Sequence, residues 1–244
     1  MVLLSGEGWL FLLRWFHFLA GITWIGMLYY FNFVQVPFFA GAEPPVRTGM
    51  IAGGLVSRAL WWFRWGAMLT FITGWLYLLH RMAQFGLQPF FATSYGWSIF
   101  IGGILGSLMW FNVWFIIWPA QQMVMASTAR VKEGGQAIPE AAARGARGGV
   151  TSRTNTMLSI PMLFFMGAAS HFAFFTPTAQ GAKIALLVVF VIILAIVEGN
   201  AVMGPATPDK ASAGKKLLAT VKGTLWAGFV LTAIIVIAIK IIFA

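Results

Sequence analysis

Six apolar segments, each about as long as a membrane-crossing helix, dominate the sequence. They cover residues 9–33, 62–79, 96–118, 156–175, 184–202 and 224–243. An α-helix crosses the ~30 Å hydrocarbon core of a bilayer with about 20 residues. Helices also satisfy their own backbone polar groups, which lipid cannot do. The pattern predicts an all-α integral membrane protein: a single polytopic domain over residues 1–244, built as a bundle of about six transmembrane helices.

The composition agrees with a bilayer as the surroundings of most side chains. Of the 244 residues, 60% are hydrophobic and 9% are charged, whereas soluble domains average about 45–50% and about 25%. The absence of cysteine excludes disulfides, iron–sulfur clusters, thiolate zinc sites and the C-x-x-C-H attachment of c-type haem from these residues. The sequence also lacks P-loop and H-E-x-x-H motifs, so no soluble catalytic signature is present.

The distribution of basic residues predicts the orientation of the chain. A net charge of +10 would suggest a nucleic-acid partner in a soluble protein. Here, however, 12 of the 16 Lys and Arg residues follow the first, third and fifth predicted helices. Cytoplasmic loops are the ones enriched in Lys and Arg. We therefore expect both termini on the outer (periplasmic) side of a bacterial inner membrane, and no binding to nucleic acid.

The three histidines are the main candidates for cofactor chemistry. His17, His80 and His171 are all expected in the outer half of the membrane. Imidazole is a usual axial ligand of haem iron, and bundles hold haems between facing helices. We predict that His17 and His171 ligate the iron of one b-type haem, with Arg14 one helical turn from His17 pairing with a propionate. His80 is a weaker candidate, and hydrogen bonding between helices is the alternative role for all three.

A second set of polar residues is expected near the inner face. It comprises Asn32, Gln35, Asn112, Gln121, Asn155, Glu198 and Asn200. Glu198 is the only acid inside a predicted span, and ionisable groups there are functional candidates. It could relay protons or contact a quinone. The favoured interpretation is structural: a pair between Glu198 and a loop arginine, with amide hydrogen bonds between helices.

Three blocks of sequence resemble the membrane domain of bacterial membrane-bound urate oxidase (urate hydroxylase). The first block is Arg14-Trp15-Phe16-His17, continuing to Thr23-Trp24-Ile25-Gly26. The second is Trp62-Phe63-Arg64-Trp65 with Ala67 and Gly74. The third is Thr154-Asn155 with Leu158-Ser159-Ile160-Pro161 and, further on, Ser170-His171. Together they cover about a third of the chain.

The resemblance implies the scaffold of that family, with His17 and His171 as haem ligands. Family members carry a cytochrome c domain after the membrane part, and these 244 residues hold no C-x-x-C-H motif. Electrons are therefore expected to pass to or from a separate cytochrome c or another redox subunit. The family's His-Gly-Gly-Gly stretch and the histidine and glutamate near the second helix are replaced here by Ala52-Gly53-Gly54, Trp61 and Gly66.

Electron transfer through a b-type haem is thus the leading functional hypothesis. One alternative is a membrane oxidoreductase acting on urate or a related small heterocycle, which leaves open whether the protein is an enzyme. Another alternative is a structural subunit of a larger respiratory or photosynthetic complex, in which the histidines bind haem, a chlorophyll-type pigment or nothing. Homo- and hetero-oligomers are both compatible with the sequence.

Overall fold

The computed structural model describes residues 5–177, 179–207 and 209–244, and the regular secondary structure of these residues is entirely helical. Several helices join end to end into longer rods. The elements are α1 (Gly6–Tyr29), η2 (Tyr30–Gln35), α2 (Val36–Gly41), α3 (Pro44–Ala52), α4 (Leu55–Phe85), α5 (Leu87–Phe90), α6 (Ser94–Asn112), η3 (Val113–Ile117), α7 (Trp118–Lys132), α8 (Ala141–His171), α9 (Gln180–Val202), α10 (Ala213–Leu217) and α11 (Val221–Ile242).

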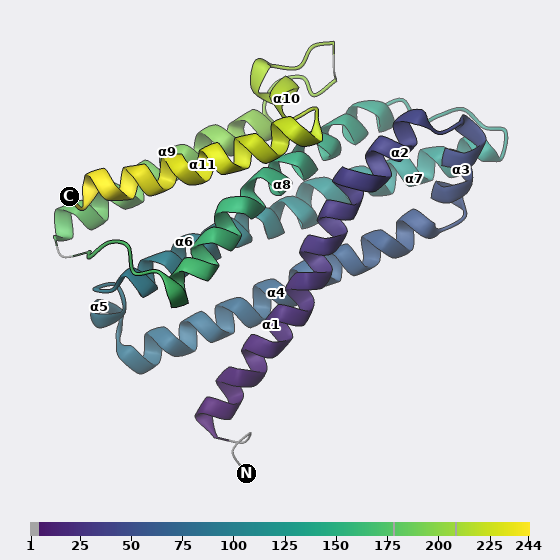
Figure 1. The fold of residues 1–244 in the computed structure, drawn as a ribbon. Coiled ribbons are helices and arrows are strands. Elements are labelled where there is room, and N and C mark those ends of the chain that lie inside the picture. Colours follow the sequence, from purple (N-terminus) through teal and green to yellow (C-terminus); the bar gives the residue numbers. More distant parts are fainter. Residues whose placement is uncertain (1–4, 178, 208) are drawn as a thin grey trace.

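The long elements form a bundle with α8 near its centre. Helix α8 packs against α6, α7 and α11, while α1 packs chiefly against α4. Figure 1 shows α9 and α11 side by side along one edge, and α1 slanting across α4 on the other. The start of α1 and the end of α11 lie at the end of the bundle where α4 finishes and α6 begins (Figure 1), which we call the terminal end. The opposite end, with α3 and α10, is the loop end.

Four helical stretches are long and apolar enough to cross a membrane: Gly6–Gly41, Ser94–Lys132, Gln180–Val202 and Val221–Ile242. They contain four of the six predicted spans. The other two predicted spans, 62–79 and 156–175, fall on α4 and α8, which are 31 residues each. Both helices carry arginines toward their loop ends, and these charged residues lower the mean hydropathy of the helices. The second of these spans was also placed too far along the chain, because α8 ends at His171.

Two π-helical segments interrupt the rods that hold the inner polar residues. Segment η2 ends just before Val36–Pro37, and η3 ends just before Trp118–Pro119. Proline has no N–H and its ring clashes with the carbonyl four residues earlier. A π turn accommodates both effects by widening the helix. The segment therefore reorients the side chains beside it, including Asn32 within η2 and Asn112 just before η3.

Small residues allow the helices to approach closely where they cross. A Cβ on Gly66 of α4 would lie 3.1 Å from the backbone nitrogen of Trp24 on α1. Within α8, Pro161 leaves the Met157 carbonyl without its usual helical donor. A Cβ on Gly228 of α11 would lie 2.9 Å from that carbonyl oxygen. Membrane helices are held by such close backbone contacts because lipid offers no hydrophobic drive for association.

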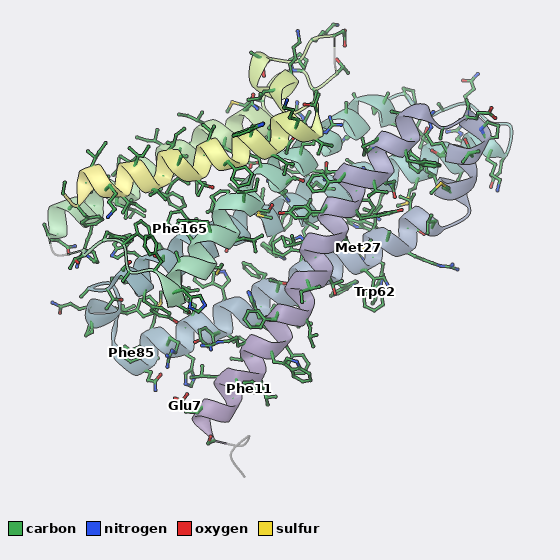
Figure 2. All side chains as sticks on the ribbon, viewed as in Figure 1. Glu7, Phe11, Met27, Trp62, Phe85 and Phe165 are labelled. Carbon is green, nitrogen blue, oxygen red and sulfur yellow. The ribbon has the colours of Figure 1, made fainter. Side chains whose placement is uncertain are left out.

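Large apolar side chains cover the outside of the bundle as well as its core. Phe11 and Trp62 are each 58% exposed, and Figure 2 shows both pointing away from the neighbouring helices. Phe165 on α8 is completely buried. Exposed apolar surface of this extent is unusual for a soluble protein. It fits a protein surrounded by lipid, in agreement with the predicted membrane localisation.

Candidate cofactor site

A cavity of about 620 Å³ opens between α1, α4, α6 and α8. Both His17 of α1 and His171 of α8 line it, as does Arg14, and we call it the histidine cavity. The helices thus bring together the three residues that the sequence singled out as one site. His80 does not line this cavity. Its imidazole also makes no hydrogen bond to the described residues.

The tautomer of His17 follows from its hydrogen bonds to α4. Its Nδ1 lies 2.9 Å from the Thr70 carbonyl oxygen and 3.3 Å from the Thr73 hydroxyl. A carbonyl only accepts, so Nδ1 must carry the proton and donate it. The lone pair then resides on Nε2, which bonds to none of the described residues. Histidines that ligate metals are held by a hydrogen bond of this kind from the other ring nitrogen.

The imidazole of His17 is also held by a glycine on the facing helix. A Cβ added at Gly74 would lie 2.9 Å from Cε1 of His17. The close approach of α1 and α4 at this level therefore depends on a hydrogen at position 74. Further glycines from α1 and α6 line the cavity, namely Gly21, Gly26, Gly103 and Gly106. Small residues at these positions leave room for a flat ligand between the helices.

His171 lies at the last residue of α8, where the helix gives way to an extended segment. Its side chain is exposed to the cavity and forms no hydrogen bond with the described residues. The two imidazoles thus approach one cavity from different helices. His17 is oriented by α4, whereas His171 has no such partner. A ligand that bridges the two would therefore order the end of α8.

A polar cluster lies beside the imidazole pair. The Arg14 guanidinium donates to the Tyr77 hydroxyl of α4, and its carbon lies 5.0 Å from the centre of the tyrosine ring. Arg14, Tyr77 and Tyr95 all line the histidine cavity. The arginine side chain is otherwise exposed, so donors remain available to an anion. Guanidinium and phenol groups are suitable partners for carboxylates.

These features fit a haem b. The cavity volume of about 620 Å³ falls within the range of about 300–1,000 Å³ for small-molecule and cofactor sites. Two imidazoles could ligate iron there, and an arginine could pair with a propionate. Among the described residues, no group of three or more His, Cys, Asp or Glu side chains could hold a metal ion.

The inner polar residues are arranged differently from the sequence expectation. Asn112 Nδ2 donates to Asn155 Oδ1 at 2.9 Å and to Glu198 Oε2 at 3.1 Å. Asn155 Nδ2 donates in turn to the Met109 carbonyl at 2.9 Å. Within the described part of the chain no arginine pairs with Glu198, so the expected Glu–Arg pair is wrong. The expected amide hydrogen bonds between helices are confirmed.

Gly74, Thr70 and Tyr77 are site residues that sequence reasoning missed. They share one face of α4 with Thr73, at the spacing of helical neighbours. The signal was a run of small and hydroxyl-bearing residues within the 62–79 segment. That run does not by itself identify the helix that it faces. Only the packing of α1 against α4 places His17 on it.

A protein-family model described as "Urate oxidase N-terminal" matches residues 75–226. The match covers more than half of the 244 residues. It includes His171 and the network around Asn155, whereas His17 precedes it. No curated protein and no solved structure matches the chain significantly. The match confirms the resemblance drawn from the sequence blocks.

Proposed function

The chain belongs to the urate oxidase N-terminal family, and from that premise we propose that it is a b-type haem electron-transfer protein of the membrane. The observation that carries the proposal is that His17 and His171 line the same cavity. When bound there, haem iron would supply a one-electron couple. The imidazoles would set its ligation, and Arg14 would neutralise a propionate.

The residues around the cavity would hold the cofactor and adjust its potential. Thr70 and Thr73 fix the tautomer of His17, and Gly74 leaves space for its ring. The hydrogen bond from Nδ1 makes the imidazole a stronger ligand. The surrounding apolar side chains exclude water, and burial is one of the factors that tune haem potentials. His80 lies outside this arrangement, which favours the pair of His17 and His171.

We further propose that α4 and α8 also span the membrane, giving six crossings with both termini periplasmic. The packing of α4 and α8 among the apolar helices supports this topology, as do the start of α1 and the end of α11 at one end of the bundle (Figure 1). In this orientation the histidine cavity opens toward the periplasm of a bacterial inner membrane. A periplasmic cytochrome c or a partner subunit is then the natural electron partner.

A second candidate is oxidation of urate or a related heterocycle, which the family description favours. Urate oxidation and electron transfer would both use the haem site, but they differ in the source of the electrons. Urate should reduce the cofactor of the purified protein directly if the second candidate is correct. If only an artificial reductant or a reduced cytochrome does so, electron transfer alone remains.

The experiment is a reduced-minus-oxidised spectrum of the detergent-purified protein and three single variants. His17→Ala and His171→Ala should each abolish the bis-histidine spectrum, because each removes an axial ligand. His80→Ala is the matched control. It too removes an imidazole, but His80 lies on α4 and does not line the cavity. Unchanged spectra in the first two variants would overturn the assignment.

A further inference from the structure

A second, smaller cavity of about 200 Å³ lies near the loop end, and we call it the loop-end cavity. Residues of η2, α4, α7 and α8 surround it, with Ala206 from the loop after α9. Its polar lining consists of Asn32, Gln35, Gln121, Ser152 and Arg153, and the rest is apolar. Several of the inner polar residues therefore belong to this cavity rather than to the Asn155 network.

Two carbonyl oxygens in the loop-end cavity lack donors. Asn32 uses both amide hydrogens, donating to the Leu28 carbonyl and to Ser152 Oγ at 2.9 Å each. Its Oδ1 has no partner among the described residues. Gln35 is 8% exposed, and its Oε1 is buried without a hydrogen bond. A buried acceptor left unpaired costs about 1–3 kcal/mol. A ligand with O–H or N–H donors would recover that cost.

Arg153 adds a positive charge to the loop-end cavity. Its side chain is half-buried in α8 and makes no hydrogen bond, ion pair or ring contact with the described residues. The lining contains no aspartate or glutamate, so nothing in the cavity balances the guanidinium charge. A half-buried cation without a counter-ion is unfavourable. The cavity therefore suits a ligand that joins an anionic group, placed at Arg153, to O–H or N–H donors, placed at the two amide oxygens.

We propose that the loop-end cavity binds a phosphoglycerol group, in which an anionic phosphate stands beside hydroxyl donors. The source is either the headgroup of phosphatidylglycerol or free glycerol phosphate. The phosphate would pair with Arg153, and the hydroxyls would donate to Asn32 Oδ1 and Gln35 Oε1. Arginine is well suited to phosphate because its planar donors engage two oxygens at once.

The size and the walls of the cavity support a headgroup. A volume of about 200 Å³ is below the range of about 300–1,000 Å³ for drug-sized ligands. It therefore accommodates a headgroup but not acyl chains. Val36, Leu60 and Phe63 contribute apolar walls, and of these Val36 is exposed on the outside of the bundle. Basic pockets between membrane helices are known to receive anionic lipid headgroups.

The test measures binding to purified full-length protein in detergent through its thermal unfolding. The probes are phosphatidylglycerol, phosphatidylcholine, sn-glycerol 3-phosphate and inorganic phosphate. Stabilisation by phosphatidylglycerol alone identifies the lipid as the source. Stabilisation by glycerol phosphate identifies the free solute. Equal stabilisation by phosphatidylcholine, or by inorganic phosphate, would overturn the proposal, because neither carries the glycerol hydroxyls.

Variants locate the binding. Arg153→Gln should weaken the apparent affinity about tenfold, equivalent to about 1.4 kcal/mol, and Arg153→Lys should recover part of it. Arg144→Gln is the matched control, because it removes the same charge from an exposed position of α8 outside the cavity. Gln35→Leu should weaken binding about fivefold by removing an acceptor. Equal affinities in the Arg153 and Arg144 variants would contradict the site. The readout is independent of haem, so the two proposals fail separately.

Discussion

The histidine cavity and the network around Asn155 lie in one bundle, yet their polar side chains are arranged in opposite ways. In the network, Asn112 of α6 donates to Asn155 of α8 and to Glu198 of α9, and Asn155 donates back to the Met109 carbonyl of α6. In the histidine cavity, His17 Nε2, the His171 ring and the donors of Arg14 face open space. A membrane bundle thus separates polar groups that lock helices together from polar groups that remain available to a ligand.

The largest effect should come from the network. Asn155→Leu removes the donor to the Met109 carbonyl and the acceptor for Asn112 while retaining the branching of the side chain at Cγ. Buried polar groups left unpaired cost about 1–3 kcal/mol each, so the thermal midpoint should fall sharply. Thr23→Val is the control, because Thr23 is partly exposed and its hydroxyl bonds only to its own helix. Equal midpoints in the two variants would show that the network does not lock the helices.

Two glycines test the contrast between packed and open regions directly. Gly228→Ala places a methyl group 2.9 Å from the Met157 carbonyl oxygen, and overpacking of this kind costs about 1–3 kcal/mol. Gly26→Ala adds a methyl group to the histidine cavity, with nothing within 4 Å. That variant should be as stable as the parent or slightly more stable, because alanine favours helix. If Gly228→Ala and Gly26→Ala lost similar stability, the two regions would not differ in how tightly they are packed.

Gly74→Ala should affect the cofactor more than the fold. The added methyl group would lie 2.9 Å from Cε1 of His17 and would turn the imidazole. Disturbing the orientation of a metal ligand typically lowers affinity about tenfold or more. Haem retained after gel filtration is the measurement. Gly167→Ala is the control, because Gly167 of α8 does not line the cavity and its added methyl group would have nothing within 4 Å; this variant should retain haem like the parent.

Arg14→Gln is expected to have the smallest effect. The arginine is exposed, and exposed charge pairs contribute about 0.2–1 kcal/mol. Haem affinity should therefore fall by about two- to fivefold, with the bis-histidine spectrum unchanged. Tyr77→Phe tests whether the tyrosine positions the arginine, because it removes the hydroxyl that Arg14 contacts. Complete loss of haem in Arg14→Gln would mean that the arginine does more than neutralise a propionate.

Helix content could be predicted from the sequence, and the histidines that line one cavity could be singled out as candidates, because long apolar segments and rare histidines are local signals. The cavity walls could not. Gly74 and Thr70 acquire their roles only from the crossing of α1 over α4. Similarly, Asn32, Gln35, Asn112 and Asn155 look alike in sequence, yet one pair lines the loop-end cavity and the other forms the network. The π segments η2 and η3 contribute to this division, and their adjacent prolines were an unused signal.

The boundaries of α4 and α8 show a second limit of prediction from the sequence. Apolar content located the middle of each helix, but both continue toward the loop end with arginines such as Arg58 and Arg153. Packing against neighbouring helices stabilises these extensions, and hydropathy does not record packing. Helix α8 also ends earlier than its apolar content predicts, at His171. The following residues are apolar, but they leave the helix as an extended segment.

The haem content of the purified protein tests the central claim most directly. A pyridine haemochrome assay on the detergent-extracted, folded protein gives both the haem type and the ratio of haem to protein. We expect about one haem b per chain, held by two imidazoles. Folded protein that takes up no haem, even when haem is supplied during expression, would contradict the assignment of His17 and His171.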